Sequence, residues 1–280
     1  MSKRTTTSRR KSSPPTYDVL DITPAAAEEI LARNTHNRNL RRRIVAGYAL
    51  DMAAGTWPEN GESIKIATDG TVIDGQHRLA AIVESGTTQR MLVVANLPMQ
   101  VQETVDGGAK RTFGDILKLR QETHYSAVAA LCRRVVLWEA GVRRGDSARF
   151  QPTTHQMLAV LDAYPEIRDS AAAGMATGAA VPIQPAAASL CHWLTHRIDA
   201  QDCAWFFEHV RTGENLRSRH PVMTLRRTLT QPLTARARLP EVVTTAYTIK
   251  AWNAFREGRE IGVLRFVAGG AKPEAFPEPQ

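Results

Sequence analysis

Five consecutive residues, Asp74, Gly75, Gln76, His77 and Arg78, combine side chains that suit an anion. Arg78 offers a planar guanidinium that pairs with phosphate through two hydrogen bonds, and His77 and Gln76 add one donor each. Gly75 has no side chain, so a ligand can approach the backbone there. Spacing alone supports a nucleotide phosphate chain only weakly, so the structural position of these residues matters.

The flanking sequence predicts that the five residues lie between a strand hairpin and a helix. Ile64 and Ile66 alternate with polar neighbours, and Asp69-Gly70 is a strong signal for a hairpin turn with both turn positions at positive φ. The apolar spacing then changes to a helical period that ends at Gly86. The first N–H groups of a helix are unpaired and carry partial positive charge, so this junction favours an anion.

The segment DGQHRLAA, after a hairpin and an earlier helical stretch, resembles the DGQHR-type branch of the ParB/sulfiredoxin superfamily over roughly residues 18–120. In that superfamily a Gly-x-x-Arg motif at a helix start binds nucleotide phosphates, which implies this role for Gly75, Gln76, His77 and Arg78. Members include CTP-hydrolysing partition proteins, sulfiredoxin, ATP-dependent kinases of free serine, and phage or mobile-element proteins. Position 76 is Gln where sulfiredoxin has its catalytic Cys, which argues against sulfinic acid reduction, and the GERR-like form of the partition CTPases is absent.

The resemblance extends to residues outside the motif. Family members place residues from the region of Asn37 and Arg38 beside the nucleotide, so both are predicted contacts; the alternative for the arginines there is a solvated helix face. Asp106, Lys110 and Arg111 match an Asp-x-Gly-x-x-Arg-Thr loop common in this branch, which predicts a second anion site. The alternative is a helix cap with two exposed basic residues, since Thr112 and Asp115 have the spacing of a capping box.

Composition favours an acidic partner such as DNA. The 280-residue chain has a formal net charge of +8 and 43% apolar residues, enough to bury a core. Its three cysteines have no paired spacing, which is typical of a reduced cytosolic protein without a structural zinc. No apolar run reaches the roughly 18 residues that a membrane span needs, and the basic start has no apolar region behind it.

The expected fold class is α+β. A small mixed-sheet domain of ParB/sulfiredoxin type is predicted at residues 17–122, followed by an all-helical domain at 123–268. The basic, Ser/Thr/Pro-rich residues 1–16 and the Pro-rich residues 269–280 are predicted to be disordered tails. The first tail is either an arm that touches the DNA backbone or a solvated start.

The helical half carries a run of basic residues without acids. Arg217, Arg219, Arg226 and Arg227 are predicted to contact nucleic acid phosphates, with a soluble basic helix as the alternative. No helix-turn-helix signature is present, so sequence-specific binding is not supported. The Ala/Gly/Pro-rich residues 171–188 are predicted to form a loop or a broken helix.

Two function classes remain open. In the first, a nucleoside triphosphate, ATP or CTP, switches a DNA-associated protein of a phage or mobile element. In the second, the chain is an NTPase or phosphotransferase, in which Asp74 or Asp106 positions Mg²⁺, orients Arg78 or activates an acceptor. A non-catalytic DNA-binding adaptor is a third alternative, and a homodimer is compatible with all three. The sequence contains no Walker A loop, no Gly-x-Ser-x-Gly elbow and no His-Glu-x-x-His motif.

Overall fold

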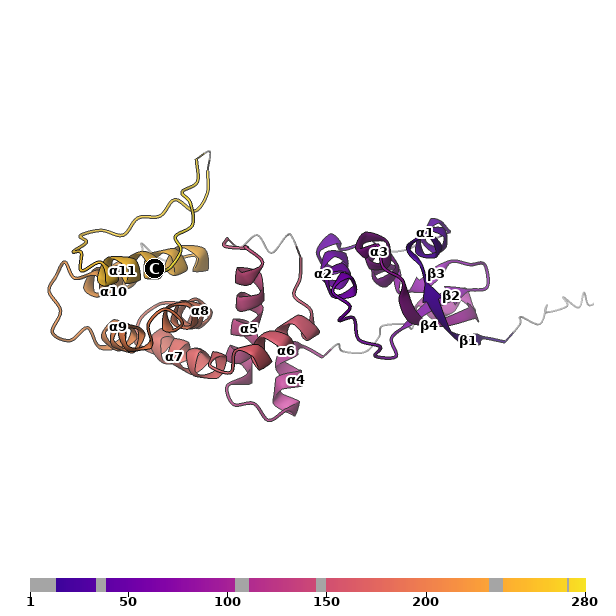
Figure 1. Ribbon diagram of the computed structural model, residues 1–280, viewed down its shortest axis with the longest axis horizontal. Helices are drawn as coiled ribbons and strands as arrows, with labels where there is room; N and C mark the ends of the chain where they lie inside the picture. Colours follow the sequence, from indigo (N-terminus) through magenta and orange to yellow (C-terminus); the bar gives the residue numbers. More distant parts are fainter. Residues whose placement is uncertain (1–13, 34–38, 104–110, 145–149, 232–238, 271) are drawn as a thin grey trace, which may run out of the picture. The chain divides into compact units, whose positions relative to one another are not determined.

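The structure is a computed structural model in which two compact units can be described (Figure 1). Met1–Lys110 with Ala148–His155 forms the first, and Arg111–Ser147 with Gln156–Gln280 the second. All strands of the described residues belong to the first unit, so the mixed α+β class is confirmed, while the ParB-like assignment stays a prediction. The division at Lys110 precedes the boundary at residue 122 that the sequence suggested. The structure describes residues 14–33, 39–103, 111–144, 150–231, 239–270 and 272–280.

A four-stranded mixed sheet forms the base of the first unit. Its strands are β1 (Thr16–Ile22), β2 (Ser63–Ala67), β3 (Val72–Asp74) and β4 (Gln89–Leu97), in the order β1-β4-β2-β3. β4 pairs antiparallel with β1 and parallel with β2, and β2 pairs antiparallel with β3. β1 was not predicted from the sequence, and it begins inside the predicted disordered start; residues 1–13 lie outside the described part of the chain.

The β2–β3 hairpin is confirmed, but its turn differs from the prediction. Gly70 N donates to Ala67 O at 3.0 Å, Ala67 N donates to Thr71 O at 2.8 Å, and only Gly70 has positive φ, at 88°. This is a three-residue loop with glycine in the left-handed position, rather than a two-residue turn that needs positive φ twice. Asp69 contributes through its side chain, since its Oδ1 accepts from Thr71 N at 2.9 Å.

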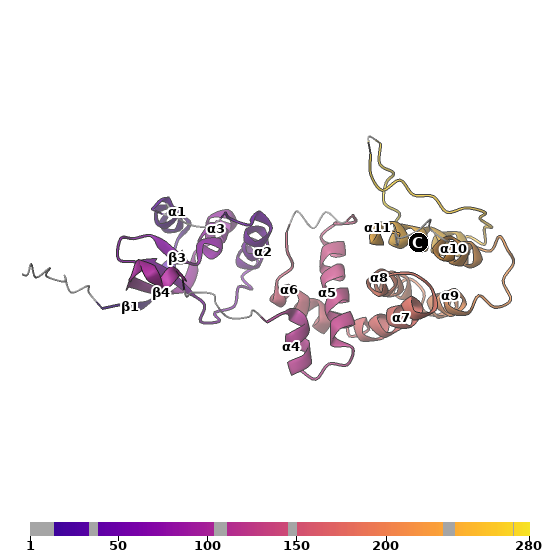
Figure 2. The same cartoon turned by 180° about the vertical axis from the view of Figure 1, so that it is seen from behind.

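Three helices lie side by side over the sheet: α1 (Pro24–Ala32), α2 (Arg42–Ala53) and α3 (Gln76–Ser85), and Figure 2 shows them from behind. α3 lies between the other two, and its Leu79, Ala81 and Ile82 are fully buried. Thr23 is the N-cap of α1, and its Oγ1 accepts from Ala26 N at 3.2 Å. A short 3-10 helix, η1 (Met99–Glu103), follows β4.

The described residues of the second unit fold into helices. Residues 171–188, predicted to be a loop or a broken helix, form most of α7 and the start of α8. Their small residues permit close packing, since a Cβ on Gly174 would lie 2.5 Å from the backbone N of Ser189. The helices of the remaining chain are α4 (Phe113–Leu119), α5 (Tyr125–Glu139), α6 (Thr154–Ala163), α7 (Ile167–Ala180), α8 (Pro185–His196), α9 (Ala200–Thr212), α10 (Pro221–Thr230) and α11 (Glu241–Arg256).

The predicted disorder of residues 269–280 is wrong for residues 272–280, which pack along the second unit. Trp252 Nε1 donates to Gln280 O at 2.8 Å, and Asn253 Nδ2 donates to Glu278 O at 2.9 Å. These side chains on α11 pair with backbone groups of the extended tail. The tail is therefore ordered by partners that are distant in sequence, which composition alone does not reveal.

Candidate functional site

Gly75 is required by the packing of α3 against β2. It is the N-cap residue of α3 and has φ 98°, and Leu79 N donates to its carbonyl at 3.0 Å. A Cβ at this position would lie 3.1 Å from Ile64 Cα on β2, so both the conformation and the space favour glycine. The predicted helix start at the DGQHR residues is confirmed.

Asp74 is the centre of a network of charges at the end of the hairpin. Its Oδ2 accepts from Lys65 Nζ at 2.8 Å and from Arg78 Nη2 at 3.3 Å, and its Oδ1 accepts from Gly75 N at 2.7 Å. Burial raises the pKa of Asp74, but the Lys65 hydrogen bond and the two positive charges outweigh burial, so the pKa lies below its ordinary value. Asp74 is therefore a stable carboxylate and a poor proton donor or acceptor near neutral pH.

The hairpin register explains why Lys65 belongs to this network. Lys65 lies directly opposite Asp74 in the β2–β3 pairing, so the two side chains share one face of the sheet. The sequence analysis did not include Lys65, although the register of a short hairpin was a signal that could have identified it.

Arg78 fastens α3 to β2. Its Nη2 donates to Ser63 O at 2.7 Å and its Nη1 to Glu62 Oε2 at 3.0 Å. The Arg78 side chain is 11% exposed, whereas that of Glu62 is 60% exposed. Arg78 Nε is buried and has no hydrogen-bond partner among the described residues. A phosphate at Nη1 would compete with Glu62, so a solvent-accessible carboxylate already occupies part of the predicted phosphate fork.

The starts of α2 and α3 meet at His77. Arg41 N, at the N-cap of α2, donates to His77 Nε2 at 3.1 Å, which assigns the proton of a neutral imidazole to Nδ1. Neither helix has a side-chain cap or an acid in its first turn. The positive ends of two helix dipoles are therefore adjacent, and the exposed Arg42 and Arg43 follow in the first turn of α2.

The other predicted nucleotide contacts are not all brought to this junction. Gln76 is 6% exposed, so its amide is buried in the first unit. Arg111 precedes the capping box of α4, which is confirmed by Thr112 N donating to Asp115 Oδ2 at 2.8 Å, and it belongs to the second unit. The predicted residues outside the described part of the chain are Asn37, Arg38, Asp106 and Lys110.

The four arginines that were predicted to contact nucleic acid differ in their surroundings. Arg217 and Arg219 are exposed, whereas Arg226 Nη1 donates to the last carbonyls of α9 and caps that helix. Arg227 Nη2 donates to Gly262 O at 2.7 Å. Arg226 thus has a structural role, and the exposed pair is better placed for phosphate contacts.

Buried thiols and imidazoles in the second unit suit a structural role. Burial raises the pKa of Cys132 to about 12 and lowers that of His192 to about 4. Among the described residues, no three His, Cys, Asp or Glu side chains come together as a metal site. Within the same residues, no helix combines the length and apolar character needed to cross a bilayer.

Comparisons with protein-family models, curated proteins and solved structures found no match to this chain. The resemblance to the ParB/sulfiredoxin superfamily therefore rests on the DGQHR residues and their position after the hairpin.

Proposed function

We propose that the first unit is a nucleotide-binding module of ParB/sulfiredoxin type, which holds the phosphates of ATP or CTP at the starts of α2 and α3. One observation carries the proposal: the hydrogen bond from Arg41 N to His77 Nε2 joins two helix starts that lack side-chain caps. The positive ends of two helix dipoles then lie next to each other, which favours an anion there. Arg42 and Arg43 add positive charge in the first turn of α2.

Arg78 takes part by exchanging one partner. Its Nη2 stays on Ser63 O and Asp74, and a phosphate oxygen replaces the exposed Glu62 carboxylate at Nη1. The exchange keeps a charge-assisted hydrogen bond in both states, so the guanidinium needs little reorganisation. Glu62 thereby acts as an internal competitor of the nucleotide.

Binding is better supported than turnover. Both oxygens of Asp74 accept hydrogen bonds, so Mg²⁺ held by Asp74 in an NTPase or phosphotransferase would compete with Lys65 and Gly75. Magnesium-dependent phosphate release that Asp74→Asn abolishes would support the enzyme class. Nucleotide binding without phosphate release supports the switch.

The binding test uses calorimetric titration of ATP, CTP, GTP and UTP with Mg²⁺. Arg41→Gln removes a charge but keeps the backbone N–H that bonds His77, and we expect affinity to fall by about three- to tenfold. Glu62→Gln removes the competitor, so affinity should rise. Arg90→Gln is the matched control, because Arg90 is 67% exposed on β4 and lies 3.6 Å from Glu59. Absence of saturable nucleotide binding in the wild-type protein would contradict the proposal.

Association with DNA is the second part of the proposed function. The net charge of +8 and the exposed Arg217 and Arg219 support contacts with the phosphate backbone, without sequence readout. The test is fluorescence anisotropy with duplex DNA over a range of salt concentrations. We expect the double change Arg217→Gln and Arg219→Gln to reduce the salt dependence, while an unchanged slope would remove these residues from the interface.

A further inference from the structure

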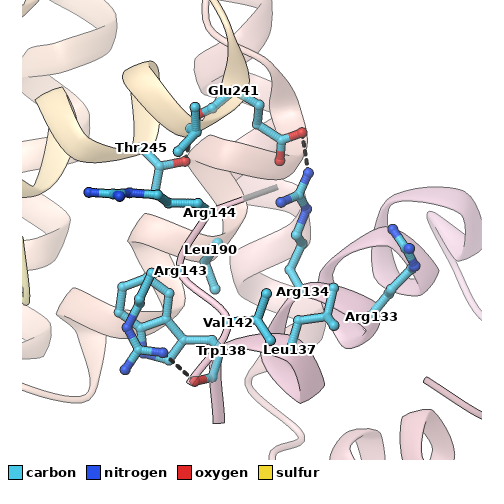
Figure 3. Close-up of a pocket in the computed structure, with 11 residues that line it drawn as sticks. Arg133, Arg134, Leu137, Trp138, Val142, Arg143, Arg144, Leu190, Glu241 and Thr245 are labelled. Atoms are coloured by element: carbon cyan, nitrogen blue, oxygen red, sulfur yellow. Dashed lines mark hydrogen bonds and ion pairs between the residues drawn. The ribbon is translucent and has the colours of Figure 1, made fainter. Parts of the chain in front are cut away.

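We infer that the second unit contains a separate anion site, which binds a small phosphate ester. Figure 3 shows a pocket between α5, the segment that follows it, and the start of α11. The cavity measures about 270 Å³, slightly below the range of about 300–1,000 Å³ typical of drug-sized ligands. Four arginines and several apolar side chains line the pocket. The lining residues are Arg133, Arg134, Leu137, Trp138, Val142, Arg143, Arg144, Leu190, Glu241, Val242 and Thr245.

Arg144 has a hydrogen-bond donor that none of the described residues uses. Arg134 pairs with Glu241, and Arg143 pairs with Glu278 of the tail, as Arg143 Nε lies 2.6 Å from Glu278 Oε1. Within the described ranges, Arg144 Nη2 donates to the backbone carbonyl of Glu274. Arg144 Nε is buried and has no hydrogen-bond partner among the described residues. A buried donor without a partner is costly, so a ligand oxygen that accepts from Arg144 would be stabilised.

The guanidinium groups at the pocket are held in place before a ligand arrives. The Arg143 guanidinium lies over the Trp138 ring at 3.8 Å from the centroid and donates to the Trp138 carbonyl. Arg144 lies over the Phe266 ring at 5.9 Å. Leu137 and Leu190 are buried at the pocket, and such apolar surroundings strengthen the attraction of an anion. Little side-chain entropy remains to be lost on binding.

The tail supplies an internal stand-in for the ligand. Glu278 places one carboxylate on Arg143 through two nitrogens, Nε at 2.6 Å and Nη2 at 3.4 Å. The Glu274 carboxylate instead binds Lys250, so it does not neutralise Arg144. A phosphate monoester carries three acceptor oxygens and about −1.5 to −2 charge at pH 7, so it can offer Arg144 the charged acceptor that Glu278 gives to Arg143.

The class of ligand follows from the size and walls of the cavity. A small ester with an apolar body places its phosphate against Arg144 and its body against Leu137 and Leu190. Phenyl phosphate has this form and serves as the probe. Benzoate has a similar ring but carries a carboxylate, so it measures the contribution of the phosphate group. Inorganic phosphate lacks the ring, so it measures the contribution of the apolar body.

The test is calorimetric titration of the full chain with the three probes at constant ionic strength. We expect saturable binding of phenyl phosphate, at least tenfold tighter than that of benzoate or inorganic phosphate. Arg144→Met keeps the apolar stem and should weaken phenyl phosphate at least tenfold. Arg219→Met is the matched control, since the Arg219 side chain is 68% exposed, and Arg41→Gln in the first unit should also leave this binding unchanged.

A second variant gives a change of opposite sign. Glu278→Gln removes the carboxylate on Arg143 from an exposed position, so phenyl phosphate should bind several-fold more tightly. Absence of saturable phenyl phosphate binding in both the wild type and Glu278→Gln would overturn the inference. Equal affinity for benzoate, or full affinity in a folded Arg144→Met protein, would also overturn it.

Discussion

Arg78 in the first unit and Arg144 in the second are both partly or largely buried arginines, but they differ in the groups that balance their charges. Arg78 is balanced by the carboxylates of Asp74 and Glu62 and also bonds the Ser63 carbonyl. Arg144 has one backbone carbonyl and a buried nitrogen without a partner among the described residues. An anion must therefore displace or compete with carboxylates of the same unit at Arg78, whereas no carboxylate among the described residues pairs with Arg144.

Replacing Arg78 should have the largest effect on stability. Arg78→Met leaves Asp74 with one cationic partner and the Ser63 carbonyl without its donor, so we expect a loss of about 3 kcal/mol in the free energy of unfolding. Urea unfolding followed by circular dichroism measures this loss. Arg90→Met at an exposed pair should cost at most about 0.5 kcal/mol. Equal stabilities of the two variants would show that the network is not structural.

The next largest effect separates backbone strain from crowding at the start of α3. Gly75 and Gly86, at the two ends of the helix, have φ of 98° and 67°. A Cβ on Gly86 meets nothing within 4 Å, so Gly86→Ala should cost about 1–2 kcal/mol from conformation alone. Gly75→Ala adds a contact at 3.1 Å with Ile64 Cα, which raises the expected cost to about 2–4 kcal/mol. Thermal unfolding of both variants checks the order, and equal costs would contradict the crowding argument.

Mild acid should affect the second unit before the first. Burial, followed by the charges of His196 and Arg211, lowers the pKa of His192 from 6.5 to about 4. Between these values the unfolded chain binds more protons than the folded one, so stability falls as pH falls from 6.5 to about 4. The pKa of Asp74 is lowered from 3.8, so its contribution is lost only below that pH.

The pH effect can be assigned with one variant. The His192 ring lies 3.0 Å from Ser170 Oγ through Nδ1, and His192→Asn keeps a donor or acceptor near that atom. His192 contributes at most about 1.4 kcal/mol per pH unit to the slope of the free energy of unfolding against pH. We expect the variant to lack this contribution when unfolding is measured between pH 4.5 and 7.5. An unchanged slope in the variant would assign the acid sensitivity to other groups.

The smallest stability change is expected for Arg144. Since Arg144 donates to a single carbonyl of the tail, Arg144→Met should lower the free energy of unfolding by about 1 kcal/mol or less. The same urea unfolding used for Arg78→Met measures it. A loss as large as that of Arg78→Met would make Arg144 a structural residue and remove the contrast between the two sites.

Local sequence signals predicted the elements around the candidate site. Asp69-Gly70 marked the hairpin, Gly86 ended α3, and Thr112 with Asp115 formed the predicted capping box. Each signal acts through backbone conformation or hydrogen bonds within a few residues, so the sequence contains it directly. The start of α3 was predicted for the same reason.

Features set by distant partners could not be predicted in this way. β1 is exposed along most of its length, so it shows no buried pattern, and it forms by pairing with β4. Glu62 neutralises Arg78 from sixteen positions away, which a motif cannot reveal.

The central claim is that the starts of α2 and α3 form a nucleotide site that Glu62 holds closed at Arg78. Its most direct test is calorimetric titration of wild type and Glu62→Gln with ATP and CTP in the presence of Mg²⁺. The account predicts saturable binding of at least one nucleotide by the wild type and several-fold tighter binding by Glu62→Gln. Failure of both proteins to bind either nucleotide would contradict the claim and leave the α3 start as a structural junction.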